Sequence, residues 1–169
     1  MKNFDPQLLS FFEHHNLSYE YVEHDPIFTV EQGKALKEDL PWIQTKNLFL
    51  TDKNGWYYLV CIESSKRLQI NQFRRLLGVK DMTFASASDM DELLHLTPGS
   101  VSVFWLIHEP RNLRLFLDQD IRDAEKIGRH PNRNDATILI THETLVQFLE
   151  INSYKANILE IADHVKIVG

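Results

Sequence analysis

"KNLFLTDKNGWYYLVCI", residues 46–62, predicts the central structural unit of the chain. Two apolar runs flank "KNG", and Asn54-Gly55 is a strong signal for a tight turn between antiparallel strands. We therefore predict a hairpin with strands over "KNLFLTD" and "WYYLVCI". Cys61, the one cysteine in the sequence, lies in the second run, so we expect a buried and inert thiol.

Helices are predicted where a capping residue precedes apolar positions at helical spacing. The predicted helices and their caps are "DPQLLSFFEHH" with Asp5, "TVEQGKAL" with Thr29, "NQFRRLL" with Asn71, "SDMDELLHL" with Ser88 and "THETLVQFLEI" with Thr141. Gly78 follows the third of these, where a helix commonly ends.

Further strands are predicted in "LSYEYVEH", "RLQI", "ATILI" and "NILEIA", and a second hairpin joins "VSVFWLIHE" to "LRLFLDQD" around "PRN". Strands and helices mix without a regular strand–helix rhythm. This pattern favours an α+β fold with a mixed, mostly antiparallel sheet. The length suits one domain over residues 1–169.

The composition, with 43% hydrophobic and 25% charged residues, is that of an ordinary globular protein. The formal net charge of −6 argues against a protein that coats nucleic acid non-specifically, although a local basic patch could still bind a few phosphates. No apolar stretch is long enough to cross a membrane, and the first residues lack a signal-peptide layout. We therefore expect a cytoplasmic protein.

Several segments begin like a known catalytic motif but lack a residue that the motif requires. "HETLV" (142–146) begins like a zinc-protease helix, but Val146 stands at the second histidine position. "GSVSV" (99–103) lacks the closing glycine of a nucleophile elbow. No Gly-rich phosphate loop of a standard type occurs. We expect no metal and no organic cofactor.

Three polar segments remain at predicted element boundaries: Lys46-Asn47, "TPGS" (97–100) and "HPNRN" (130–134). Taken singly, a lysine before a strand is usually solvated, and a Pro-Gly turn is usually just a turn. Taken together and in this order, they belong to four longer segments. These are "VEHDPIFTVEQ", "TKNLFLTDKNGWYYLVCI", "LTPGSVSVFWLIHEPRNLRLFLDQDI" and "IGRHPNRNDATILITHETLVQFL".

These segments resemble the YbaK/prolyl-tRNA synthetase-associated editing domain family, and most of all its ProX-type branch. The resemblance implies a barrel-like sheet with helices outside it. It also implies hydrolysis of the ester that joins a wrong amino acid to the 3′-terminal ribose of tRNA(Pro). Alanine is the amino acid most expected. The implied partners are the acceptor end of tRNA(Pro) and prolyl-tRNA synthetase.

The resemblance places the catalytic roles on Lys46, Gly99 and His130. Lys46 would hold a phosphate or the terminal adenosine. Backbone amides at Gly99 to Val101 would donate to the charge that develops on the carbonyl oxygen. His130 would orient the substrate or relay a proton, and a hydroxyl of the tRNA is expected to help activate the water. The residues assigned to substrate binding are Thr29, Asn47, Ser100, Val101, Val103 and Asn134.

One departure keeps the choice of amino acid open. The family loop reads G-x-x-x-P, but Val103 replaces the proline, and a bulky Trp105 follows. Editing of cysteine- or serine-charged tRNA is therefore an alternative, and a non-catalytic module that binds tRNA or a protein is another. Phe104 is a further candidate for the wall of a small apolar pocket that would admit only an amino acid smaller than proline.

Basic residues suggest where the tRNA backbone would lie. By charge alone, Arg129 and Arg133 are predicted to lie near acceptor-end phosphates. A second candidate patch, for the tRNA stem, comprises Lys66, Arg67, Arg74 and Arg75; the alternative is a solvated helix face.

Overall fold

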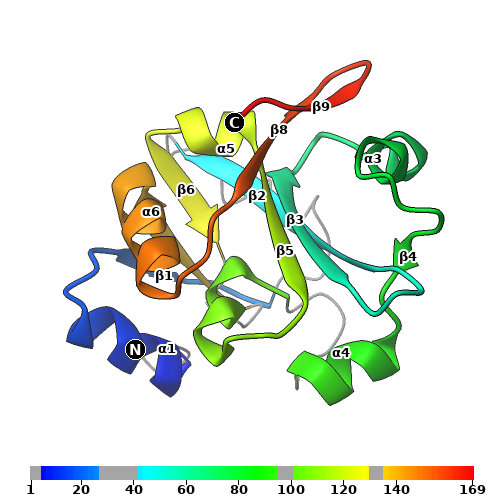
Figure 1. Ribbon diagram of the computed structural model, residues 1–169. Coiled ribbons are helices and arrows are strands. Elements are labelled where there is room, and N and C mark those ends of the chain that lie inside the picture. Colours follow the sequence, from blue (N-terminus) through cyan, green and yellow to red (C-terminus); the bar gives the residue numbers. More distant parts are fainter. Residues whose placement is uncertain (1–4, 27–41, 95–100, 130–134) are drawn as a thin grey trace.

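The computed structural model describes residues 5–26, 42–94, 101–129 and 135–169 (Figure 1). Within these residues nine strands form one mixed sheet in the order β1-β7-β6-β2-β3-β5-β8-β9, with β4 beside β2. The strands are β1 (Glu20–Glu23), β2 (Ile43–Thr51), β3 (Tyr57–Glu63), β4 (Thr83–Phe84), β5 (Leu113–Asp118), β6 (Lys126–Arg129), β7 (Ala136–Thr141), β8 (Asn157–Ile161) and β9 (Val165–Ile167). The predicted α+β class with a mixed sheet is confirmed.

The predicted hairpin is the centre of this sheet. β2 and β3 pair antiparallel from Thr45 opposite Glu63 to Thr51 opposite Tyr57. Gly55 adopts a φ of 79°, which is why the turn needs glycine there. The Asp52 carboxylate accepts hydrogen bonds from the Asn54 N–H at 2.9 Å, the Trp56 N–H at 3.0 Å and the Tyr58 hydroxyl at 2.8 Å. The turn is therefore held by a buried, fully bonded carboxylate.

This carboxylate makes the hairpin sensitive to acid. Burial alone would raise the pKa of Asp52, but the hydrogen bonds from Trp56, Tyr58 and Asn54 outweigh it and lower the pKa below its ordinary value. Burial and the nearby Asp52 raise the pKa of Tyr58 to about 12. A carboxylate whose pKa is lower in the folded than in the unfolded chain stabilises the fold at pH values above its unfolded pKa. This stabilisation is lost as the pH falls through the folded pKa.

We therefore predict that Asp52→Asn lowers the free energy of unfolding by about 1–3 kcal/mol at pH 7, since the anion accepts charge-assisted bonds there. The difference from wild type should shrink as the pH falls below the ordinary Asp pKa of about 4, because the carboxylate of the unfolded chain is protonated there and the folded one only at lower pH. Urea denaturation at both pH values measures it, with the exposed Asp163→Asn as the control. An equal deficit at pH 7 and pH 3 would contradict the assignment.

Two cores lie on opposite faces of the sheet. The first contains Phe49 of β2 and residues of α1, η1 and α6, among them Phe104, whose ring lies 5.5 Å from Phe12 and 5.3 Å from Phe148. The second contains Leu50 and is covered by α3 through Phe73. Because side chains alternate along a strand, Lys46 lies on the face of Leu50, and Asn47 lies on the face of Phe49.

The helices are α1 (Pro6–His14), α3 (Ile70–Leu76), α4 (Ala87–Leu94), the 3-10 helix η1 (Val103–His108), α5 (Gln119–Asp123) and α6 (His142–Ile151). Asp5 and Thr141 cap α1 and α6 as predicted. Two predicted caps were wrong. The residue before α3 is Gln69, two positions before the predicted Asn71, and the Ser86 hydroxyl, rather than that of Ser88, accepts from the Asp89 N–H in α4. None of the described helices is long and apolar enough to cross a membrane. The predicted helix "TVEQGKAL" lies outside the described residues.

The second predicted hairpin is wrong. "VFWLIH" forms η1, begun by the Ser102 hydroxyl, which accepts from the Phe104 N–H at 3.2 Å. Four successive residues of this run, from Val103 to Leu106, are buried, and such a run cannot distinguish a buried strand from a buried helix. "RLQI" is also not a strand, because Ile70 already begins α3.

Candidate functional site

The sheet opens beside β2, at the residues that the sequence singled out. On the edge away from β3, β2 pairs first with β6, with Ile43 opposite Ile127 and Gln44 opposite Gly128, and later with β4 at Leu50. Between these pairings, residues 46–48 have no strand partner on that edge among the described residues. Lys46 and Asn47 therefore lie on a stretch of β2 whose outer edge pairs with no described strand, and we call this stretch the opening beside β2.

Arg129, the last residue of β6, is buried on the inner side of this opening. It is only 3% exposed, and its Nη1 donates to Asn47 Oδ1 at 3.2 Å. Asn47 Nδ2 in turn donates to the Val101 carbonyl at 2.9 Å. Arg129 Nε and Nη2 are buried without a hydrogen-bond partner, and Arg129 forms no ion pair with any described residue. These two N–H groups of the buried cation therefore have no oxygen acceptor among the described residues, and the Cys61 thiol lies beside the guanidinium.

The burial of Arg129 was not predicted. The sequence suggested a rim residue beside tRNA phosphates, but β6 lies between β2 and β7, and this pairing carries its last side chain inward. A buried, unpaired charge costs about several kcal/mol, so its presence calls for a compensating role. Sequence order alone gives no signal for it, because Asn47 lies 82 residues away.

Cys61 lies directly opposite Asn47 in β3 and is fully buried. Burial raises the pKa of its thiol, and the Arg129 guanidinium offsets part of that effect. The thiol therefore stays protonated at neutral pH, as expected of an inert cysteine.

Lys46 faces the other side of the sheet, away from the Asn47–Arg129 pair. It is half-buried and lines a groove together with Arg67, Asn71 and Phe84. The structure thus brings Asn47 together with Val101 and Arg129, and separates Lys46 from them by the sheet itself.

The other predicted site residues divide into two groups. Val103 and Phe104 have no exposed surface and pack in the first core, so their assignment to a pocket wall stays a prediction. Six others lie outside the described residues: Thr29, Gly99, Ser100, His130, Arg133 and Asn134. In the sequence, Ser100 directly precedes Val101, and His130 directly follows Arg129.

The predicted stem-binding patch is only partly available. Lys66 Nζ lies 2.7 Å from the fully buried Asp118 and 2.8 Å from Asp120, so two carboxylates neutralise it. Arg74 donates to Asn71 Oδ1 and to the Lys80 carbonyl. Only Arg67 of the four lines the groove beside Lys46. Among the described residues, no group of three His, Cys, Asp or Glu side chains is placed to hold a metal ion.

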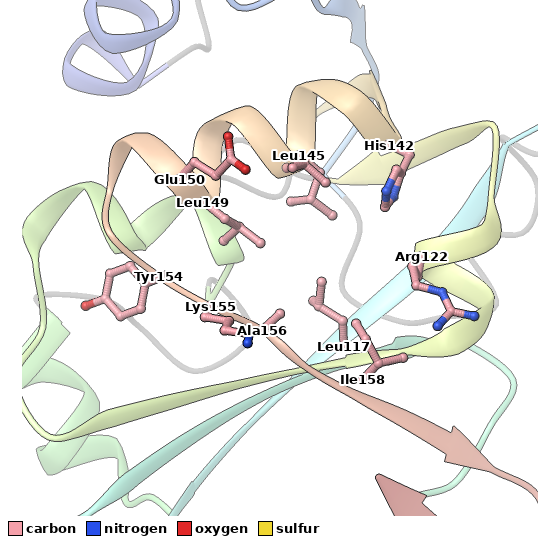
Figure 2. Close-up of a pocket in the computed structure, with 11 residues that line it drawn as sticks. Leu117, Arg122, His142, Leu145, Leu149, Glu150, Tyr154, Lys155, Ala156 and Ile158 are labelled. Carbon is pink, nitrogen blue, oxygen red and sulfur yellow. The ribbon is translucent and has the colours of Figure 1, made fainter. Parts of the chain in front are cut away.

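A separate cavity of about 310 Å³ lies between α6 and β8. Figure 2 shows Leu145 and Leu149 of α6 facing Leu117 and Ile158 of the strands. Its wall is largely apolar, and no residue of the predicted site lines it. Arg122 at its rim is already paired with Asp123 at 2.7 Å. This cavity is therefore distinct from the opening beside β2.

Comparison with known proteins identifies the family of the chain. The family model described as "Aminoacyl-tRNA editing domain" matches residues 24–148, which include the opening, the groove and the Asn47–Arg129 pair. The chain belongs to the aminoacyl-tRNA editing domain family. The family implies an aminoacyl-tRNA substrate and deacylase activity.

Two curated relatives cover most of this editing domain. The chain is 28% identical over 148 residues to "Prolyl-tRNA editing protein ProX" of Acetoanaerobium sticklandii, covering 86% of this chain and 90% of that protein. It is 31% identical over 156 residues to "Prolyl-tRNA synthetase associated domain-containing protein 1" of Danio rerio, covering 90% and 85%.

Solved structures share the fold of this editing domain. The crystal structure of hypothetical protein APE2540 superposes with a TM-score of 0.72 at 22% identity, covering 95% of this chain and 99% of that one. A second structure, described as a candidate trans-editing enzyme for prolyl tRNA synthetase, gives a TM-score of 0.67 at 18% identity, covering 95% and 100%.

Proposed function

We propose that this editing domain is a trans-editing deacylase that hydrolyses mischarged tRNA(Pro), with Ala-tRNA(Pro) as its main substrate. The observation that carries the proposal is the opening beside β2, where Lys46 on one face and the buried Arg129 on the other flank a single strand edge. The choice of tRNA is supported by the names of the relatives, one a prolyl-tRNA editing protein and the other a prolyl-tRNA synthetase associated domain-containing protein. Prolyl-tRNA synthetase is the proposed second partner.

In the proposed reaction, water attacks the carbonyl carbon of the aminoacyl ester, and the bond from that carbon to the ribose oxygen breaks. The products are the free amino acid and a tRNA with a free terminal hydroxyl. Negative charge develops on the carbonyl oxygen and must meet donors that are already in place. Arg129 offers two such N–H groups, and Asn47 fixes the guanidinium that carries them.

The second candidate substrate is Ser-tRNA(Pro), and the observation that favours it is the two Arg129 N–H groups that have no oxygen acceptor in the described part of the chain. A site built to bind a hydroxyl is left with unpaired donors when the smaller alanine enters, and this lowers the rate for alanine. If Arg129 donates to the carbonyl oxygen of the ester, replacing Arg129 slows the release of alanine and of serine equally. If Arg129 binds the hydroxyl of the substrate serine, replacing it slows serine release much more than alanine release.

Lys46 tests whether the protein is a catalyst or only a binding module. Its ammonium forms no ion pair with any described residue, so it is free to hold a phosphate or the terminal adenosine. We predict that Lys46→Ala slows single-turnover deacylation of Ala-tRNA(Pro) about 100-fold, because a displaced ester loses its alignment with water. Lys53→Ala, at a lysine whose side chain is 86% exposed, is the control and should leave the rate unchanged. Tight tRNA binding without cleavage by the wild type would favour the binding module instead.

A further inference from the structure

We propose that the groove beside Lys46 binds the unpaired nucleotides that precede the terminal adenosine of the tRNA. The groove has a volume of about 400 Å³, and its lining includes Lys46, Leu48, Arg67, Gln69, Asn71 and Phe84. This inference rests on the proposed function, because it assumes that the aminoacylated end enters at the opening beside β2.

The charge of the groove suits a phosphodiester backbone. Two cations, Lys46 and Arg67, line it, and no carboxylate of the described residues does. Neither cation forms an ion pair with a described residue, whereas the neighbouring Lys66 is bound by two aspartates. In a chain with a net charge of −6, this leaves a local positive surface that can contact phosphates.

Phe84 supplies a surface on which a base can stack. The residue is 57% exposed, yet its backbone is held against β2 by the pairing with Leu50 and by the bond from the Ala85 N–H to the Phe49 carbonyl at 2.9 Å. An aromatic ring on a fixed strand beside cations is the usual arrangement for binding single-stranded nucleic acid. A ring this exposed adds little to the core, so a base is the occupant it suits.

Two amides complete the groove. Gln69 precedes α3, but its side chain makes no capping hydrogen bond. The Asn71 Oδ1 atom accepts from Arg74, which leaves the amide NH₂ group of Asn71 as a donor. These side chains can bind base edges or sugar hydroxyls. Lys46 lies in the groove and is next in sequence to Asn47, which faces the other side of the sheet. The proposal therefore takes the nucleotide strand from the groove past the unpaired edge of β2.

The test uses an uncharged RNA hairpin of the tRNA(Pro) acceptor stem, with 2-aminopurine in place of the penultimate base. Wild-type protein should quench its fluorescence through stacking on Phe84. Phe84→Leu should remove the quenching and raise Kd about tenfold or more, the usual effect of losing one base–aromatic contact. Arg67→Gln should raise Kd and lower the slope of log K against log salt by roughly 0.7.

The matched control is Arg114→Gln, which removes the same charge from an exposed arginine on β5, over the Trp56 ring at 4.9 Å. It should leave quenching and Kd unchanged. Absence of quenching by the wild type would overturn the inference. So would Phe84→Leu and Arg67→Gln variants that bind the hairpin as tightly as the wild type does. Because the probe carries no ester, the two proposals can fail separately. Binding in the groove without deacylation sinks only the proposed reaction, and deacylation with unaltered binding by the variants sinks only the groove.

Discussion

Replacing Arg129 by methionine is expected to slow deacylation of Ala-tRNA(Pro) about 100-fold or more, the usual loss when a donor to a developing oxyanion is removed. The same substitution should leave the free energy of unfolding equal to or above that of wild type. Methionine fills a similar volume without a charge, and a buried charge with two unshared N–H groups is costly in the absence of substrate. Single-turnover kinetics and urea denaturation measure the two effects.

Arg122→Met is the matched control, since it removes the same charge from an arginine paired with Asp123 at 2.7 Å on the surface. It should change the deacylation rate little. A structural role for Arg129 predicts the reverse pattern, with a large loss of stability and a retained rate. That pattern would remove Arg129 from the proposed site.

Gly128→Ala is expected to lower the free energy of unfolding by about 3 kcal/mol, the upper part of the range for overpacking a core. A Cβ atom at Gly128 would overlap the ring of Trp42, which is buried against it. Gly128 also pairs with Gln44, and its carbonyl accepts from the Thr45 hydroxyl at 3.3 Å. Relief of the overlap would separate β6 from β2 and move Arg129.

The double variant Trp42→Ala/Gly128→Ala tests the cause. If the ring is the obstacle, Gly128→Ala should cost much less in the Trp42→Ala background than in wild type. Gly169→Ala, where an added Cβ meets only ordinary contacts, should lie within about 0.5 kcal/mol of wild type. Equal costs of Gly128→Ala in both backgrounds would show that the ring is not responsible.

Local signals predicted the parts of the fold that local chemistry determines. The Asn54-Gly55 turn and the caps at Asp5 and Thr141 were confirmed, because each depends on a few neighbouring residues. The run from 103 to 108 was predicted wrongly, since burial on all sides removes the periodicity that separates strand from helix.

The candidate site was harder to predict because it depends on long-range pairing. The contact of Arg129 with Asn47 spans 82 positions, and it exists only because the short β6 pairs with both β2 and β7. One feature was readable in advance: strand alternation alone puts Lys46 and Asn47 on opposite faces. The groove beside Lys46 gave no such signal, because Phe84 and Arg67 come from separate segments.

Single-turnover deacylation by the wild-type protein in excess, with Ala-tRNA(Pro), Ser-tRNA(Pro), Cys-tRNA(Pro) and Pro-tRNA(Pro) side by side, tests the proposed function most directly. We predict rapid release of alanine and no release of proline. Faster release of serine than of alanine would instead favour Ser-tRNA(Pro) as the main substrate, with Arg129 binding the serine hydroxyl. If all four esters stay intact, the protein is not a deacylase for mischarged tRNA(Pro).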